Sequence, residues 1–461
     1  MSRQRPREVP VLRGDQVTVT VEGFGDGPDG LAKLDNYVVF VPGVLPGETA
    51  TVNITSATRK FGRGELVAVQ RRAKDRTTAR CAHFLACGGC HRQHQDYRAQ
   101  LTSKQQRLQR TVDWALGEAT VEVAATVPAQ SPYGERHKVA AQLMHAHDGR
   151  LVAALHRARS PELVPIHECP ASDPLAWDLL DRTIELLNEL PHRAWDPWFA
   201  PHELLRSVLV RTTTSGEAHL VIVATKPDVP GLDDLIDDLH DAGATSINVN
   251  HNDGDPARLL GPETILVSGR PFVEETLAGV RYRIGPASFF QTSPRMAEHL
   301  VEHVLGWLQP GPDDDVADLY CGVGLLTLPL AQRARSVFGV ERHGGAVDDA
   351  RAAAAANGLR NVTFRTGHVD GVLRLCRRGE LPRPHLVAVD PPREGLGEAV
   401  VAELCHLRPQ RLAYVSCEPQ TLQQDLRALH AAGFRTVAVT PFDMFPQTAL
   451  VESLVCLELG T

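Results

Sequence analysis

Three short segments in the C-terminal third of the chain combine reactive side chains with turns. Cys417 follows the apolar run Leu412–Val415 and precedes a Glu-Pro turn. Asp318 opens a segment that ends in Gly322–Gly324, and Asp390 is followed by two prolines. A thiol is a nucleophile, and side chains at the ends of parallel strands gather at one edge of a sheet. The three segments therefore predict covalent catalysis beside a cofactor site.

The Asp318 segment favours S-adenosylmethionine (SAM) over a dinucleotide as the cofactor. Gly322 and Gly324 let the backbone approach a ligand, but position 327 is Thr where the dinucleotide pattern has a third glycine. Glu341 ends the next expected strand, where an acidic side chain can bind both ribose hydroxyls. SAM has a ribose but no pyrophosphate to cradle. A tight turn with a surface glutamate is the alternative interpretation.

Asp390 and Cys417 each have a simpler interpretation as well. Two prolines hold the Asp390 carboxylate at a strand end, although a plain turn has the same composition. A cysteine is often only a small buried hydrophobe. Because Cys417 precedes a helix expected from Gln420, we predict an exposed thiol with a lowered pKa.

A second group of reactive residues lies near the other end of the chain. Three cysteines occur within ten residues: Cys81, Cys87 and Cys90. In a reducing compartment this spacing indicates metal or cluster ligation rather than disulfides. Iron–sulfur clusters and structural zinc usually take four ligands, and Cys169, which a proline follows, is the candidate for the fourth. We predict a [4Fe–4S] cluster; the alternatives are zinc completed by His91 or His94, and no metal.

The elements that must position these residues suggest a multidomain chain. After Pro312 strands alternate with helices, which indicates a C-terminal α/β doubly wound, Rossmann-like sheet with ligands at the carboxyl ends of its strands. Residues 11–70 contain about five short strands, which fit an OB-like barrel of a kind often used on RNA. We expect three parts: an N-terminal β-barrel over 10–72, a central α+β domain with the cysteine loop over 73–285, and the α/β domain over 286–461.

The charge is distributed unevenly along the chain. The net charge is −8, yet residues 1–110 carry 18 Lys and Arg against 10 Asp and Glu. A basic N-terminal part suits a nucleic-acid contact, and a solvated surface is the alternative. The basic residues 1–8 precede no apolar stretch, and no apolar run approaches the roughly 18 residues of a membrane span. We expect a cytoplasmic monomer with no membrane partner.

Taken in order, the C-terminal segments resemble those of the RNA 5-methyluridine methyltransferases. The resemblance rests on four segments: Asp318–Gly324, Asp390–Gly395, Ser416–Pro419 and Asp443–Pro446. Residues 12–70 are similar to a TRAM domain. Cys81, Cys87, Cys90 and Cys169 match the [4Fe–4S] ligands of the bacterial large-subunit ribosomal RNA uracil-5-methyltransferases. Because it covers nearly the whole chain, the resemblance implies a TRAM barrel and a SAM-dependent methyltransferase domain.

The resemblance also implies a mechanism and a role for each site residue. Uracil C5 is a poor nucleophile, so a thiolate adds to C6, C5 takes the methyl group, and a base then removes the C5 proton. Cys417 matches the nucleophile and Glu452 the base, and Phe289 or Phe290 would stack on the uracil. The residues that match SAM contacts are Gln291, Tyr320, Glu341 and Asp390.

The expected substrate is ribosomal RNA, whose target base must leave its stack to reach a buried thiol. The same reaction on tRNA is one alternative, and a non-catalytic iron–sulfur RNA-binding protein is another. Three positions depart from the family pattern: Leu325, Glu418 and Leu450. None of them removes the nucleophile, the base or the cofactor acids, so we expect an active enzyme.

Overall fold

The computed structural model describes residues 9–25, 27–254 and 258–460. The basic residues 1–8 lie outside this range. The chain forms two compact units. The first contains the described residues up to Ser103 together with 155–164 and 447–449, and the second contains 104–154, 165–446 and the residues from 450 onward. The three-part division with boundaries near 72 and 285 stays a prediction.

The first unit contains a closed barrel of five strands in the order β1-β2-β3-β5-β4. The strands are β1 (Gln16–Phe24), β2 (Gly30–Leu34), β3 (Tyr37–Val41), β4 (Thr49–Ala57) and β5 (Phe61–Arg71). Alternate side chains point inward, so that Val19, Val52 and Ile54 are buried. Closure leaves no unpaired strand edge, and the predicted barrel is confirmed.

A seven-stranded sheet lies in the middle of the chain, with the order β12-β11-β10-β9-β6-β7-β8. Its strands are β6 (Lys138–His145), β7 (Leu151–His156), β8 (Leu163–Pro165), β9 (Leu205–Thr212), β10 (Ala218–Ala224), β11 (Ser246–His251) and β12 (Glu263–Gly269). Its helices are α2 (Pro174–Leu187), the 3-10 turn η2 (Leu232–Leu235) and α3 (Ile236–Asp241). Every residue of β9 and β10 is buried, because both faces of the sheet are covered at these central strands.

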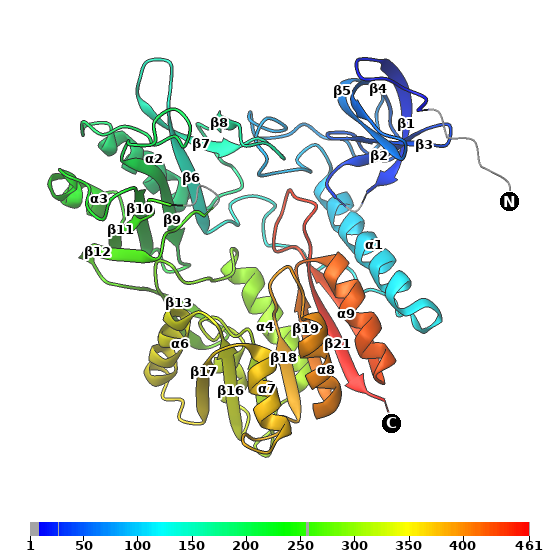
Figure 1. Ribbon diagram of the computed structural model, residues 1–461, viewed down its shortest axis with the longest axis vertical. Helices are drawn as coiled ribbons and strands as arrows, with labels where there is room; N and C mark the ends of the chain where they lie inside the picture. The colour runs from blue at the N-terminus through cyan, green and yellow to red at the C-terminus, as the bar shows by residue number, and fades with distance from the viewer. Residues whose placement is uncertain (1–8, 26, 255–257, 461) are drawn as a thin grey trace. The chain divides into compact units, whose positions relative to one another are not determined.

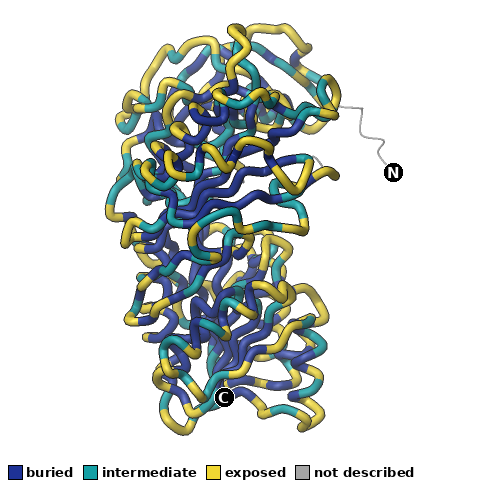
Figure 2. Tube along the Cα trace, turned by 90° about the vertical axis from the view of Figure 1, so that its left-hand side faces the viewer, coloured by how far each residue is buried: buried dark blue, intermediate teal, exposed yellow. Residues whose placement is uncertain are grey.

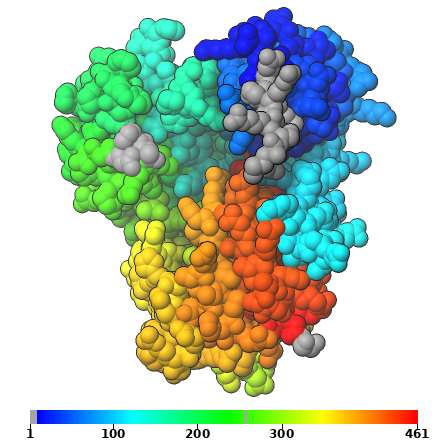
Figure 3. All heavy atoms as spheres, turned by 45° about the vertical axis from the view of Figure 1, so that its right-hand side comes forward, coloured from blue at the N-terminus to red at the C-terminus, as the bar shows by residue number. Residues whose placement is uncertain are grey.

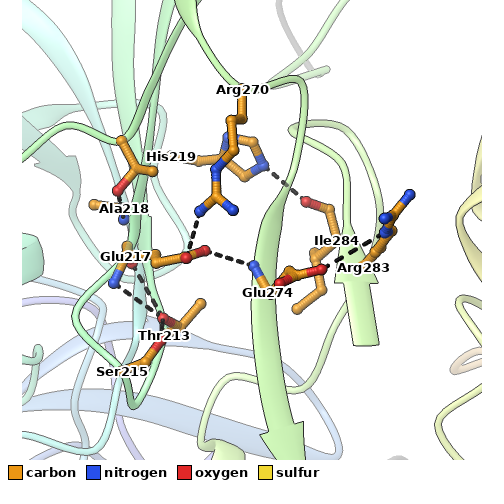
Figure 4. Close-up of polar contacts among 10 residues, drawn as sticks. Thr213, Ser215, Glu217, Ala218, His219, Arg270, Glu274, Arg283 and Ile284 are labelled. Atoms are coloured by element: carbon orange, nitrogen blue, oxygen red, sulfur yellow. Dashed lines mark hydrogen bonds and ion pairs between the residues drawn. The ribbon is translucent and has the colours of Figure 1, made fainter. Parts of the chain in front are cut away.

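The hairpin of β13 (Val273–Leu277) and β14 (Val280–Ile284) is tied to this sheet by polar contacts (Figure 4). The His219 ring donates from Nε2 to the carbonyl of Ile284 at 2.8 Å. Glu217 forms an ion pair with Arg270 and accepts the backbone N–H of Glu274 at 2.7 Å. Burial lowers the pKa of His219 to about 4, so the ring is neutral at physiological pH. These contacts fix the start of the segment that leads to Phe289.

The C-terminal sheet has the order β17-β16-β15-β18-β19-β21-β20 (Figure 1). Its strands are β15 (Asp315–Leu319), β16 (Ser336–Glu341), β17 (Val362–Thr366), β18 (Leu386–Val389), β19 (Arg411–Ser416), β20 (Phe434–Phe442) and β21 (Glu452–Leu459). The first five strands of that order are parallel, and β21 is antiparallel to both of its neighbours. The strand order reverses between β15 and β18, which is where such sheets bind ligands. The predicted doubly wound α/β fold is confirmed.

Helices cover both faces of the C-terminal sheet. One core includes residues of α4 (Pro294–Leu308), α5 (Thr327–Ala331) and α6 (Gly344–Ala356). The other includes α7 (Val369–Arg377), α8 (Gly397–Leu407), α9 (Pro419–Ala431) and the second half of α1 (Tyr97–Leu116), which the 3-10 turn η1 (Gly117–Ala119) follows. Figure 2 shows the strands buried and the connecting loops exposed.

The end of α1 lies against α9 (Figure 3). There the Arg427 guanidinium stacks on the Trp114 ring, with 3.7 Å from the guanidinium carbon to the ring centroid. Sequence patterns did not place α4, α7 or α8. Within the described ranges, no helix is long and apolar enough to cross a membrane.

Candidate active site

The predicted site residues of the C-terminal sheet meet at one edge because of where its strands end. Tyr320 follows β15, Glu341 ends β16, Asp390 follows β18 and Cys417 follows β19. Strand β21 runs in the opposite direction and begins at the same edge with Glu452. The register of the sheet therefore brings together five residues that are far apart in the chain.

Cys417, the residue after β19, lies near Glu452, the first residue of β21. Ser416 is the register partner of Ser453, whose hydroxyl donates to the Ser416 carbonyl at 3.0 Å. Cys417 and Glu452 are the next residues toward the edge. Glu452 is only 3% exposed, and its Oε1 has no hydrogen-bond partner among the described residues. Since buried carboxyl oxygens normally have a partner, this one is available to a group that enters the site.

The buried Glu452 and the half-buried Asp390 make this edge unfavourable for further negative charge. Burial raises the pKa of Glu452 well above its usual value, and the nearby Asp390 raises it further. Burial likewise raises the pKa of Asp390, against the smaller effect of a hydrogen bond from Gln291. Two like charges that are shielded from water cost much free energy, so this edge disfavours the ionised form of both carboxyl groups.

The prediction of an exposed thiol with a lowered pKa is wrong. Cys417 is half-buried, and burial raises its pKa to about 12, with Glu452 and Asp390 adding to the effect and Arg393 opposing it. The helix α9 does begin at Pro419. Its N-terminal partial charge is about half an elementary charge, which does not offset burial beside two acids. The Cys417 thiol is therefore neutral in the protein without ligands.

The loop after β15 is a tight turn that fixes Glu341. Tyr320, Gly322 and Gly324 all have positive φ, at 67°, 52° and 90°. The Gly322 N–H donates to Glu341 Oε2 at 3.2 Å and the His343 N–H to Oε1 at 2.7 Å. Each carboxylate oxygen keeps a further lone pair. Glu341 is thus oriented by backbone donors and still able to accept hydroxyl hydrogen bonds.

Thr327, which replaces the third glycine of the dinucleotide pattern, donates its hydroxyl to Asp318 Oδ2 at 2.5 Å. Burial, with Asp390 and Glu341 nearby, raises the pKa of Asp318 to about 7. The departures Leu325 and Glu418 have structural roles: the Leu325 carbonyl accepts the Tyr282 hydroxyl at 3.0 Å, and Glu418 caps α9.

The Phe289–Gln291 segment reaches this edge from the side of the central sheet. Gln291 is buried and donates to Asp390 Oδ2 at 3.4 Å. Phe289 is 67% exposed and Phe290 only 4%, so Phe289 is the one available for stacking on a base. The buried Arg211 donates to the carbonyls of Ser288 and Phe290 at 3.3 and 3.4 Å. Sequence patterns missed Arg211, because an arginine in an apolar strand does not reveal which distant loop it holds.

The cysteines outside this edge do not form a recognisable site. Cys81, Cys87, Cys90 and Cys169 are each half-buried. Over the described part of the chain, no group of three or more His, Cys, Asp or Glu side chains is placed so as to hold a metal ion. Burial, then the charges of Arg76 and Arg92, lowers the pKa of His94 to about 4, so its ring is neutral.

Comparison with known proteins matches the whole chain. The profile of the TRAM domain matches residues 10–67, and that of tRNA (uracil-5-)-methyltransferases matches 263–369 and 383–459. An uncharacterized RNA methyltransferase of Halalkalibacterium halodurans is 33% identical over 464 residues, which cover all of both chains. One from Gloeobacter violaceus is 33% identical and covers 97% of each chain. The crystal structure of the Pyrococcus abyssi tRNA (uracil-54, C5)-methyltransferase in complex with S-adenosyl-L-homocysteine is 26% identical, with a TM-score of 0.76, and covers 95% of this chain and 99% of its own.

Proposed function

This chain belongs to the tRNA (uracil-5-)-methyltransferase family of RNA methyltransferases, and from that premise we propose that it methylates uracil C5 in RNA through a covalent adduct with Cys417. The enzyme is SAM-dependent, as its family is. The observation that carries the proposal is the pairing of β19 with β21, which ends at Ser416 and Ser453, next to Cys417 and Glu452; Glu452 is a buried carboxyl group whose Oε1 has no partner among the described residues.

The proposed reaction has three steps. The Cys417 sulfur, as the thiolate, forms a bond to C6, and the electron pair of the C5=C6 bond moves toward O4 as an enolate. C5 then bonds to the methyl carbon, whose bond to sulfur breaks with the electron pair left on sulfur. Glu452 removes the C5 proton, the C5=C6 bond forms again, and the thiolate leaves. SAM supplies an electrophilic methyl group on a positively charged sulfur.

Each remaining site residue has a proposed role in holding the reactants. Glu341 accepts hydrogen bonds from the ribose hydroxyls, and Tyr320 lines the tight turn beside it. Gln291 and Asp390, which are hydrogen-bonded to each other, contact the methionine part of SAM. Phe289 stacks on the extruded uracil. Because the pKa of the Cys417 thiol is raised, the thiol must pass its proton to a base, in the simplest case solvent water, before its sulfur bonds to C6.

We propose ribosomal RNA as the substrate, on the resemblance of the TRAM barrel and the four cysteines to bacterial ribosomal RNA enzymes. tRNA is the second candidate, and the similarity to the Pyrococcus abyssi tRNA enzyme favours it. The test is a mass-spectrometric map of 5-methyluridine in ribosomal RNA and tRNA from a host that lacks the protein. A ribosomal site that is lost and restored only by wild type, not by Cys417→Ala, supports the first substrate. A lost tRNA site supports the second substrate. If neither RNA loses a 5-methyluridine, the result contradicts the proposed function.

We infer the [4Fe–4S] ligand set of Cys81, Cys87, Cys90 and Cys169 from the spacing of the cysteines and from the resemblance to the bacterial ribosomal RNA enzymes. The described side chains are not arranged to hold such a cluster, so no catalytic step is assigned to it. Its proposed role is structural.

A further inference from the structure

The loop between β20 and β21 delivers the proposed base to the site. Phe442, the last residue of β20, is the register partner of Glu452, the first residue of β21. The intervening residues 443–451 therefore leave the sheet beside Glu452 and return to it there. Whatever holds this loop also limits where the Glu452 carboxyl group can lie.

Lys104 of α1 holds the start of the loop. Its side chain is 3% exposed and forms an ion pair with Asp443, whose side chain is fully buried. The same ammonium donates to the Phe445 carbonyl at 3.0 Å. Asp443 directly follows the partner of Glu452, and its N–H donates to the Val127 carbonyl at 3.0 Å. A buried cation that serves two groups of one loop restricts that loop strongly.

Gln100, one turn earlier on α1, holds the far end of the loop. Its amide donates to Gln447 Oε1 at 3.0 Å, and both side chains are buried. The Gln447 carbonyl also accepts the N–H groups of His91 and Arg92, each at 2.9 Å. Gln447 has φ of 65°, a strained conformation for this residue type that persists only where the surroundings determine it. Only residues 448–451 separate Gln447 from Glu452, so this anchor lies close to the proposed base along the chain.

Gln100 and Lys104, we propose, are positioning residues that hold the 443–449 loop so that Glu452 reaches the C5 proton of the methylated adduct. The proposal rests on the proposed function and concerns only its last step. In that step the C5 proton passes to Glu452, its bonding pair forms C5=C6, and the bond between C6 and the Cys417 sulfur breaks. A displaced Glu452 leaves thiol addition and methyl transfer intact, and the methylated RNA stays attached to the protein.

The test compares Gln100→Leu with Gln105→Leu on the same helix. Gln105 donates to the Val123 carbonyl at 2.9 Å, which lies outside the 443–449 loop, so Gln105 is the matched control. Full-length protein is mixed with substrate RNA and methyl-labelled SAM, quenched in denaturant and resolved by electrophoresis. We expect the release of methylated RNA from Gln100→Leu to slow about ten- to one-hundred-fold, the range for a small misplacement of a catalytic group. Methyl transfer should change less than about twofold, and Gln105→Leu should behave like wild type.

A second variant tests the other end of the loop without leaving a buried charge unpaired. Lys104→Met combined with Asp443→Asn removes both members of the ion pair, and its folding is checked by thermal unfolding. It too should accumulate the labelled adduct. Folded variants that slow both steps equally, or that accumulate no adduct, would overturn the positioning role. Glu452→Gln separates a failure of the positioning role from a failure of the proposed mechanism. If Glu452→Gln accumulates adduct and the loop variants do not, only the positioning role fails. If Glu452→Gln forms no adduct, the proposed mechanism fails as well.

Discussion

The carboxyl edge of the C-terminal sheet and the Cys81–Cys90 segment both carry reactive side chains, but different interactions fix them. At the edge, Cys417 and Glu452 are adjacent because two strands are paired along their length. The cysteine segment contains turns instead, held by bonds such as Cys87 N–H to the His83 carbonyl at 2.8 Å and Gly88 N–H to the His156 carbonyl at 2.9 Å. A paired sheet sets side-chain positions without a ligand, whereas loop ligands often come together only when the metal binds. The predictions below test this contrast.

The largest effect is expected at the sheet edge. Cys417→Ala should lower methylation on the order of a thousandfold or more, because no other described cysteine lies beside Glu452 at this edge. The affinity for RNA should change little. The measurement is methyl incorporation together with equilibrium RNA binding, and Cys405→Ala, a half-buried cysteine on α8, is the control. Residual activity of Cys417→Ala near the wild-type level would contradict the nucleophile.

The prediction for the Cys81–Cys90 segment concerns a bound cluster and not a reacting side chain. Protein purified without oxygen should contain iron and sulfide and absorb broadly near roughly 400 nm, and Cys87→Ser should lose both signals. Cys376→Ser, at a buried cysteine of α7, should keep them. Wild-type protein with neither iron nor sulfide would contradict the cluster proposal. Stoichiometric zinc in that protein would support a zinc site instead.

The pH dependence of thiol alkylation should expose the burial of Cys417. Because its pKa is raised to about 12, the thiolate fraction below that pH rises about tenfold per pH unit, and so should the rate with iodoacetamide between pH 7 and 9. Mass spectrometry of the peptide that contains Cys417 gives this rate. Glu452→Gln should speed the reaction at each pH, since Glu452 contributes to the raised pKa. A rate that levels off near pH 7 would show that the site favours the thiolate.

The smallest effect is one of stability. The pKa of Glu452 is raised in the folded protein, so the stabilisation from its bound proton is fully present below the unfolded pKa of about 4.3 and is lost as the pH rises toward the folded value. Glu452→Gln should therefore match wild type near pH 4 and have a higher Tm at pH 8, by on the order of a few degrees. Thermal unfolding at both pH values measures it. Equal Tm values at pH 8 would mean that ionisation of the buried Glu452 carboxyl group does not lower the stability of the folded protein.

Local patterns predicted much of the fold. The alternating residues of β1 and β4 indicated the barrel, and the strand–helix alternation after Pro312 indicated the doubly wound sheet. The helices α4, α7 and α8 were not placed, although α4 has a capping serine and a proline in its first turn that could have marked it. Gln291, Tyr320, Glu341 and Asp390 remain proposed SAM contacts, while the structure adds Arg211 as the residue that holds the Phe289–Gln291 segment.

The sequence alone determined which residue types end which strands, and through them the family of the enzyme. Only the tertiary structure decided how those residues act on one another. The raised pKa of Cys417 depends on Glu452 and Asp390, which reach it from other strands, and the loop before Glu452 is held by Gln100 and Lys104 from the other half of the chain. Turn and strand signals are local, whereas burial and electrostatic interaction depend on distances in space. Those distances are set by sheet register and helix packing, which no short stretch of sequence contains.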